Sequence, residues 1–495
     1  MASRREYSIF GRQVGYIIAA NILMLLAGLV EIPIVTKALG ASDYGIWSLI
    51  LVTNGLIVPF AGLALGDAII RFLAAEKDRD RVADTFLSIC TVVFISASVA
   101  SLLLFALAGP LARSVFRDPD ADFYVRLASA LIILTCMFNC TQSFMRMQRK
   151  IGLRTVLALL QSLATLGLII LFVTIGYGLT GVVAAALLAL VLTNVVAFAL
   201  TLRETGLRIP RFVNMKKYLR WSLPMVPNAG ILWIINVSDR YMVSYFIDSA
   251  AAGVYSAAYS IGNYAYFALF PLGMVLYPNI VKTYDEGHPE QAANYLKYGL
   301  KYLMMISIPS AFGLTVLSAQ LLDLLTTAEF AEGSKVIPLV AFGGVIFCLY
   351  QIGVYIIHVV NKTYLTVWLL GSSALLNVVL NAVLIPRMGM VGAAVATVVA
   401  YGVLGLMTLT VTRRFLKFDL SLPFMAKSIA SSGVMALCIW LLDPRSLWPV
   451  LGCVVLGAVV YFVVLISLRG LSKAEINFFI NFVREALRTV LPIHK

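Results

Sequence analysis

Long apolar runs, separated by short polar or Gly/Pro-rich breaks, follow one another along almost the whole chain. Most approach or exceed the roughly 20 residues that an α-helix needs to cross a bilayer. The period-two alternation of membrane-barrel strands is absent, and backbone groups in hydrocarbon must bond internally. The pattern therefore predicts an all-α polytopic membrane protein with about fourteen transmembrane helices. The predicted runs are 14–39, 45–73, 83–109, 123–145, 153–175, 179–202, 218–247, 252–281, 295–318, 334–360, 364–386, 389–412, 424–442 and 448–468.

Composition agrees with this pattern and excludes two other classes. The chain has 495 residues, of which 61% are hydrophobic and 13% are charged. Soluble domains have about 45–50% apolar and about 25% charged residues, so a soluble fold could not bury this surface. The net charge of +14 does not indicate a nucleic-acid binder, because the cations do not gather in one patch.

The cations instead indicate an orientation in the membrane. If the N-terminus is inside, 29 of the 38 Lys and Arg residues lie in cytoplasmic segments. Six flank external loops, and Arg71, Arg126 and Arg240 lie within spans. By the positive-inside rule, both termini are expected in the cytoplasm.

No motif of catalysis or metal binding interrupts the apolar pattern. The six cysteines fall inside apolar runs, the three histidines are scattered, and no phosphate-binding loop or catalytic serine motif is present. We therefore expect no enzyme activity, no catalytic residues, no metal and no resident cofactor, although coupling to H⁺ or Na⁺ stays open.

An internal repeat organises the chain. Residues 35–48 align without gaps on 243–256 at an offset of 208, and Gly178–Ala185 aligns on Gly389–Ala396 at 211. Two copies separated by six helices share one orientation and are related by an axis along the membrane normal. The predicted divisions are an N-terminal lobe (1–202), a cytoplasmic linker (203–217), a C-terminal lobe (218–414), an extra helix pair (415–468) and a cytoplasmic amphipathic tail (469–495) that begins with a capping box of Ser472 and Glu475.

Two acids inside the spans are repeat-related. Glu31 aligns on Asp239, which predicts an acid at the same depth in each lobe. Asn236, Asp239 and Arg240 share one helix face, because their spacings are three and four residues. Ionisable groups in spans are functional hypotheses by default. The alternative is a structural network that pairs Arg240 with Glu31 or Asp239.

Three further charges complete the candidate site. Asp67 and Arg71 are four residues apart and can pair on one helix face, although Arg71 can instead reach the membrane surface. Arg126 lies near the external start of a span. Arginines in an apolar cavity attract a multiply charged anion and can bind phosphate bidentately, whereas a nearby acid can carry a cation or neutralise the empty site.

Several segments resemble one family of exporters. Leu39–Trp47, Leu63–Phe72, Ser238–Tyr241 and Gly253–Ser256 are similar to the polysaccharide transporter family of the multidrug/oligosaccharidyl-lipid/polysaccharide exporter superfamily. The resemblance covers about residues 10–468 and rests on the order of the motifs, the repeat and the fourteen spans together.

The resemblance implies a flippase that moves a polyprenyl-diphosphate-linked oligosaccharide across the cell inner membrane by alternating access, for O-antigen, capsule or exopolysaccharide. It implies that Arg71 and Arg240, with Arg126 as a further candidate, meet the pyrophosphate, and that Glu31, Asp67, Asp239 and Asn236 tune or couple transport. Expected partners are the lipid-linked oligosaccharide and membrane lipids, with a polysaccharide polymerase and glycosyltransferases as further candidates. The alternatives are a cation-coupled multidrug antiporter, a peptidoglycan or teichoic-acid precursor exporter, and a non-transporting scaffold.

Overall fold

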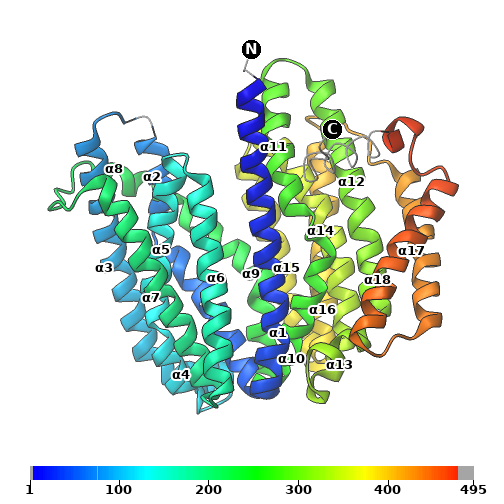
Figure 1. Ribbon diagram of the computed structural model, residues 1–495, viewed down its shortest axis with the longest axis horizontal. Coiled ribbons are helices and arrows are strands. Elements are labelled where there is room, and N and C mark those ends of the chain that lie inside the picture. The colour runs from blue at the N-terminus through cyan, green and yellow to red at the C-terminus, as the bar shows by residue number, and fades with distance from the viewer. Residues whose placement is uncertain (1–3, 75, 478–495) are drawn as a thin grey trace, which may run out of the picture. The chain divides into compact units, whose positions relative to one another are not determined.

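The computed structural model describes residues 4–74 and 76–477, with side chains except those of residues 4–18, 228 and 270. Over this part the chain is helical with short turns, contains no strand, and confirms the all-α prediction (Figure 1). The helices are α1 (Arg4–Ala61), α2 (Leu65–Leu73), α3 (Arg79–Leu111), η1 (Ala112–Phe116), α4 (Ala121–Ala128), α5 (Ala130–Met147), α6 (Ile151–Thr174), α7 (Gly178–Thr205), α8 (Met215–Ser222), η2 (Leu223–Met225), α9 (Val226–Phe246), α10 (Ser249–Asn263), η3 (Tyr264–Tyr266), α11 (Leu269–Asp285), α12 (Pro289–Val316), α13 (Ser318–Leu325), η4 (Ala328–Lys335), α14 (Val336–Val359), α15 (Tyr364–Met388), α16 (Met390–Thr412), α17 (Leu422–Leu442) and α18 (Leu447–Ser467).

The number of spans differs from the prediction. Among the described residues, 11 helices are long and apolar enough to cross a membrane, or 12 if a bent pair, Ser249–Tyr266 with Pro271–Asp285, is one span. The predicted count of fourteen is therefore not confirmed. One reason is that α1 contains the first predicted run and residues 45–61 of the second, with a break between them at Gly40, where φ is 71°. Another is that α9, which carries Asp239 and Arg240, is not among the counted helices.

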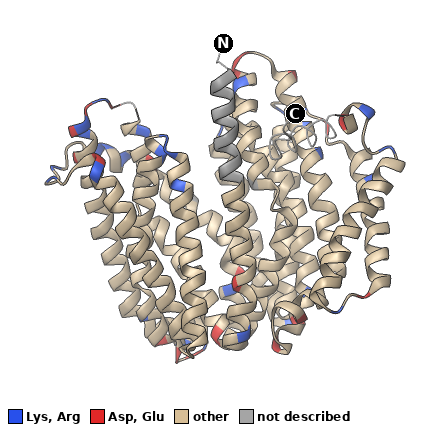
Figure 2. Ribbon diagram, viewed as in Figure 1, with Lys and Arg blue, Asp and Glu red and all other residues tan. Residues whose placement is uncertain are grey.

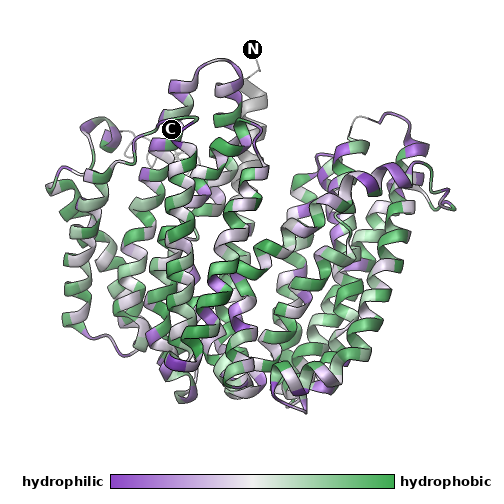
Figure 3. Ribbon diagram, turned by 180° about the vertical axis from the view of Figure 1, so that it is seen from behind, coloured by the Kyte–Doolittle hydropathy of each residue, from purple (hydrophilic) through white to green (hydrophobic). Residues whose placement is uncertain are grey.

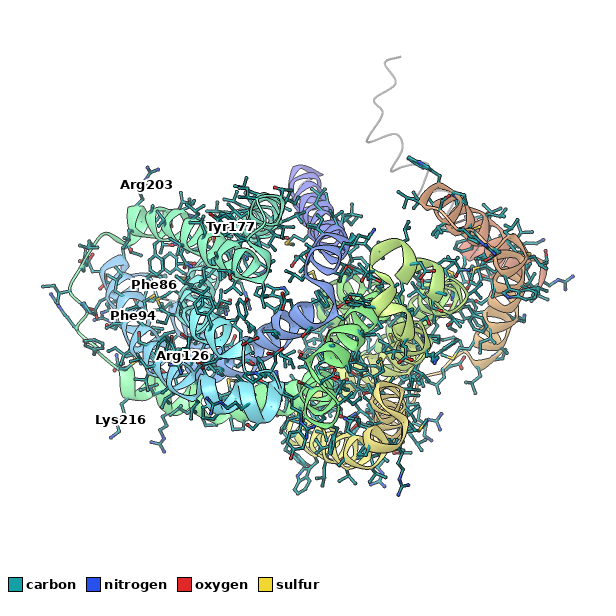
Figure 4. All side chains as sticks on the ribbon, turned by 90° about the horizontal axis from the view of Figure 1, so that it is seen from below. Phe86, Phe94, Arg126, Tyr177, Arg203 and Lys216 are labelled. Atoms are coloured by element: carbon teal, nitrogen blue, oxygen red, sulfur yellow. The ribbon has the colours of Figure 1, made fainter. Side chains whose placement is uncertain are left out.

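Apolar side chains lie both between the helices and on their outer faces. In α3, Phe86 is fully buried and its ring centroid lies 4.5 Å from that of Phe144 in α5, whereas Phe94 is 50% exposed (Figure 4). Figure 3 shows apolar residues along the length of the helices and polar residues mainly at their ends. Such helices are suited to lipid, where outward-facing apolar side chains cost nothing. The protein is therefore a multi-pass membrane protein.

Charged residues have the complementary distribution. Most Lys, Arg, Asp and Glu residues of the described part lie at helix ends and in the connecting turns, and few interrupt the middle of a helix (Figure 2). This matches the cost of placing charge in hydrocarbon. The few that do lie inside helices are the candidates for function.

The chain forms two compact units. Unit 1 contains Met1–Ser260, Leu322–Val336 and Tyr364–Ala400, and unit 2 contains Ile261–Leu321, Ile337–Thr363 and Tyr401–Lys495. In unit 1, α7 packs on α5 and α6, and α9 packs on α1 and α15. In unit 2, α12 packs on α11, α17 and α18. The division into lobes 1–202 and 218–414 stays a prediction.

Inside unit 1, repeat-related residues touch each other. Gly45 and Gly253 are aligned in the repeat, and their helices, α1 and α10, approach so closely there that a β-carbon on either glycine would overlap backbone of the other helix. One turn further on, Ser48 Oγ donates to Ser256 Oγ at 2.6 Å, and these two serines are also an aligned pair. Contacts between equivalent residues are characteristic of a two-fold axis. They are the arrangement that the predicted relation between the two copies requires.

The predicted capping box is present at the start of the tail. The backbone N–H of Glu475 donates to Ser472 Oγ at 3.2 Å, and that of Ser472 donates to Glu475 Oε2 at 2.8 Å. Glu475 also pairs with Lys301 of α12, within unit 2. The rest of the predicted amphipathic tail, from residue 478 onward, lies outside the described residues.

Candidate functional site

A buried carboxylate on α9 is the centre of the candidate site in unit 1. Asp239 is 2% exposed and its Oδ2 accepts a hydrogen bond of 2.6 Å from the Tyr255 hydroxyl on α10. Its Oδ1 accepts the backbone N–H of Arg240 at 2.9 Å. A buried carboxylate is stabilised only when such donors replace water. Asp239 is therefore held in a fixed position by its neighbours.

The adjacent arginine is buried but has fewer partners. The Arg240 side chain is 9% exposed, and its Nη1 lies 3.8 Å from Asp239 Oδ1. Nη1 also donates to the Asn236 carbonyl oxygen at 3.5 Å, and the guanidinium carbon lies 4.5 Å from the centroid of the Tyr259 ring. A guanidinium has five N–H donors. Among the described residues these are its only polar contacts, so most of its donors stay available to an anion.

The structure thus places Asp239 and Arg240 together and adds two tyrosines. Asn236 contributes its backbone carbonyl oxygen to Arg240, whereas its side-chain Nδ2 donates to the Leu232 carbonyl oxygen at 2.7 Å. Of the two pairings proposed as a structural alternative, Arg240 contacts Asp239 through a long ion pair, and no ion pair joins Arg240 to Glu31 in the described part. Sequence reasoning did not single out Tyr255 or Tyr259 as site residues. The available signal was their position on α10, since Tyr255 lies within the Gly253–Ser256 segment and Tyr259 one helical turn after it.

Glu31 has a different environment from its repeat counterpart. It is half-buried in α1, and no hydrogen bond or ion pair reaches it from the described residues. At the repeat offset, Trp47 occupies the position that corresponds to Tyr255, so the hydroxyl that binds Asp239 has no equivalent in the first copy. The two acids therefore keep their places in the repeat while only Asp239 has a bonded donor.

Arg71 and Asp67 lie on α2, and both are exposed. The Arg71 guanidinium carbon lies 5.8 Å from the centroid of the Trp221 ring of α8, and no ion pair joins it to Asp67 within the part of the chain described. The Phe72 ring packs against Trp221, with centroids 5.5 Å apart. Arg71 is thus part of a cation–aromatic contact between α2 and α8 rather than of an acid–base pair.

Arg126 lies on α4, and Figure 1 shows α4 and α2 at opposite ends of unit 1. Its Nε is 3.0 Å from Asp122 Oδ1, and its guanidinium carbon is 5.0 Å from the Phe105 ring centroid. Figure 4 labels Arg126 in the bundle. Arg71 and Arg126 are therefore too far apart to bind one pyrophosphate together.

A second polar cluster, on α15 and α16 of unit 1, was missed by the sequence analysis. Asn381 Nδ2 donates to Asn377 Oδ1 at 3.0 Å, and Asn377 Nδ2 donates to Thr397 Oγ1 at 3.3 Å. All three residues are buried, and Asn381 Oδ1 has no partner among the described residues. The signal was two amides four residues apart inside an apolar run, which a search restricted to charged residues passes over. No group of three His, Cys, Asp or Glu side chains in the described part could hold a metal ion.

Family models match two overlapping regions of the chain. The model of the polysaccharide biosynthesis protein family matches residues 10–284. The MatE family model matches residues 224–383. The first match covers more than half of the 495 residues.

Curated relatives and solved structures give consistent similarities. A probable low-salt glycan biosynthesis flippase of Haloferax volcanii is 22% identical over 384 residues, which are 78% of this chain and 79% of that relative. A second probable flippase of the same organism is 20% identical over 92% of this chain and 96% of its own length. A solved structure of the lipid II flippase MurJ, in an inward closed conformation, superposes with a TM-score of 0.74 at 16% identity, over 92% of this chain and 98% of that one. This last likeness shows a shared fold.

Proposed function

The chain belongs to the polysaccharide biosynthesis protein family, and from this premise we propose that it flips a polyprenyl-diphosphate-linked oligosaccharide across the cell inner membrane. It is a membrane transporter of the flippase and exporter class and not an enzyme. The lipid-linked glycan is the finer part of the proposal. It is supported by the glycan biosynthesis flippase and the lipid II flippase among the similar proteins.

The observation that carries the proposal is the buried guanidinium of Arg240. Most of its donors have no protein acceptor within the described part, so a pyrophosphate can take two of them bidentately. Asp239, 3.8 Å away, neutralises Arg240 while no substrate is bound. The Tyr255 hydroxyl holds Asp239 in that position. Because Asp239 and Arg240 are both buried, a substrate diphosphate there is shielded from water and its charge interactions are strengthened.

The other candidate charges have separate roles in this proposal. Arg71, exposed beside Trp221, meets the headgroup at the end of unit 1 that carries α8, and Arg126 meets it at the end that carries α4. Glu31, which lacks a bonded donor in the described part, is the residue proposed to take up H⁺ or Na⁺ if transport is coupled. Asp67 and Asn236 line the path between these positions. Alternating access moves the headgroup past these side chains, with both termini in the cytoplasm.

Unit 2 offers an apolar cavity for the lipid. The cavity has a volume of about 390 Å³ between α12, α17 and α18 and is lined by apolar side chains that include Met305, Leu314, Met435 and Phe462. Such a lining suits a hydrocarbon chain rather than a sugar. We propose that part of the polyprenyl chain lies there. A polysaccharide polymerase and glycosyltransferases are proposed partners in the same biosynthesis.

The proposal is tested with purified protein in proteoliposomes and a fluorescent polyprenyl-diphosphate oligosaccharide. Arg240→Ala should lower the flipping rate about 10- to 100-fold, the equivalent of about one charge-assisted hydrogen bond. Arg445→Ala is the matched control, because Arg445 is exposed and pairs only with Asp443 among the described residues. Size-exclusion profiles show whether each variant is folded. Wild-type flipping with Arg240→Ala would remove Arg240 from the substrate site.

One observation favours a second function, a cation-coupled multidrug antiporter: the MatE family model matches residues 224–383. The two functions differ in the phenotype of a strain that lacks the gene. A flippase leaves lipid-linked oligosaccharide in the inner leaflet and reduces surface glycan. An antiporter leaves surface glycan normal and makes the cells sensitive to cationic dyes.

A further inference from the structure

A short segment between α7 and α8 carries unusually exposed apolar side chains. Leu207 is 86% exposed and Ile209 is 88% exposed, the two highest values for large apolar side chains in the described part of the chain. Phe212 and Val213 of the same segment are also exposed. Residues 206–214 are called the linker segment below.

The exposure is not the result of a loose loop, because α3 holds the linker segment at three points. Arg208 Nη2 lies 2.6 Å from Asp80 Oδ1. The backbone N–H of Arg211 donates to Asp84 Oδ1 at 2.8 Å, and that of Phe212 donates to Ser88 Oγ at 3.1 Å. Leu207 and Ile209 flank the bound Arg208 and are thereby turned away from the bundle.

The linker segment lies where two membrane spans end. It leaves α7 at Thr205, the last residue of the candidate span Gly178–Thr205, and it binds the first turns of the candidate span Arg79–Phe116. Figure 1 shows this end of unit 1, with α8 beside the ends of α2 and α3. This is the depth at which hydrocarbon meets lipid headgroups.

Exposed cations lie in the helices before and after the linker segment, Arg203 in α7 and Lys216 and Arg220 in α8. Arg203, Lys216 and Arg220 are exposed, and no ion pair reaches them from the described residues. Figure 4 shows Arg203 and Lys216 directed away from the bundle. Of the nearby acids, Glu204 is paired with Lys150, and Asp80 and Asp84 of α3 are bonded to the linker segment itself. The local surface is therefore positive as well as apolar.

We propose that the linker segment is a membrane-surface anchor, in which Leu207 and Ile209 enter the acyl boundary and Arg203, Lys216 and Arg220 bind anionic phospholipid headgroups. Interfacial segments combine apolar side chains that enter the membrane with flanking cations in this way. If the linker segment instead docked into a groove of another protein, it would need to present a continuous apolar face. Here two apolar side chains project among cations, which fits a lipid surface.

The test uses spin labels on the full-length protein in nanodiscs. Of the six cysteines, Cys438 is half-buried and the other five are buried, so Cys438→Ser gives a quiet background. Labels are placed by Leu207→Cys and Ile209→Cys, with Glu286→Cys, in the exposed turn after α11, as the control. The measurement is the accessibility of each label to oxygen and to a water-soluble nickel chelate. Each variant is measured in phosphatidylcholine nanodiscs and in nanodiscs that also contain about 30% phosphatidylglycerol.

We expect the labels at 207 and 209 to be severalfold more accessible to oxygen than to nickel, and the control label to show the reverse. Phosphatidylglycerol should lower nickel access at 207 and 209, and the triple variant Arg203→Gln, Lys216→Gln, Arg220→Gln should remove that effect. Nickel access at 207 and 209 equal to the control would overturn the proposal and favour a protein partner. Immersion that is insensitive to phosphatidylglycerol would overturn its anionic-lipid part.

Discussion

Asp239 and Arg240 are neighbours in sequence, yet their bonding in the structure is unequal. The carboxylate uses both oxygens, one with the Tyr255 hydroxyl and one with the Arg240 backbone. The guanidinium, by contrast, has a long ion pair and a stacking contact with Tyr259. An acid fixed by the protein beside an arginine with free donors suits a site whose ligand is an anion.

The Tyr255 hydroxyl can be tested by a single-atom change. Tyr255→Phe leaves the ring but removes the donor to Asp239, which should cost about 1–3 kcal/mol of stability for a buried charged acceptor. The flipping rate should also fall, because a carboxylate freed from Tyr255 can turn toward Arg240 and compete with substrate.

Thermal unfolding in detergent and flipping in proteoliposomes measure the two effects. Tyr350→Phe is the control, because Tyr350 is 3% exposed and no hydrogen bond to its hydroxyl is found in the described part. Equal melting temperatures for the two variants would show that the bond to Asp239 contributes nothing to stability.

At the scale of elements, α1 and α10 of unit 1 approach each other closely at Gly45 and Gly253. Because each glycine lies against the backbone of the other helix, neither position has room for a side chain. The bond between Ser48 and Ser256 one turn away keeps the two helices in register. This contact relates the two copies of the repeat directly.

We expect Gly253→Ala to be strongly destabilising, by about 3 kcal/mol or more, because helix backbones would have to move apart. Gly167→Ala in α6 is the matched control, since open space surrounds that glycine. It should be neutral or slightly stabilising, because alanine is the better helix former. Expression level and thermal unfolding of the two variants give the comparison, and equal stability would contradict the close approach.

At the scale of the whole molecule, the distribution of Lys and Arg residues is the basis of the predicted orientation. With the N-terminus inside, 29 of the 38 Lys and Arg residues fall on the cytoplasmic side. Two exposed positions distinguish this orientation from the inverted one. They are Lys216 at the start of α8 and Arg445 between α17 and α18.

The orientation can be measured with a membrane-impermeant thiol reagent on intact cells. In the Cys438→Ser background, Arg445→Cys should react from outside, and Lys216→Cys should react only after the membrane is permeabilised. These results follow from the positive-inside rule, which places Lys216 in a basic cytoplasmic loop. The reverse labelling pattern would invert the topology and with it the direction of the proposed transport.

How much the sequence could predict differs between the fold and the site. The all-α membrane class was predictable because a span is a local property: a run of apolar residues satisfies its own backbone and faces lipid. The number of spans was harder to predict, because α1 continues through a break at Gly40 and α9, which carries Asp239 and Arg240, is not among the counted helices. Helix spacing also predicted that Asn236, Asp239 and Arg240 share one face.

The sequence alone determined the membrane class, the repeat, and which charges stand inside helices, since each is written in composition and spacing along one segment. Only the tertiary structure decided their partners. It paired Asp239 with Tyr255, set Arg71 beside Trp221, and left Glu31 without a bonded donor in the described part. The reason is physical: these contacts join side chains on different helices, and helix packing depends on the shapes of both faces at once. No periodicity within one helix contains that information.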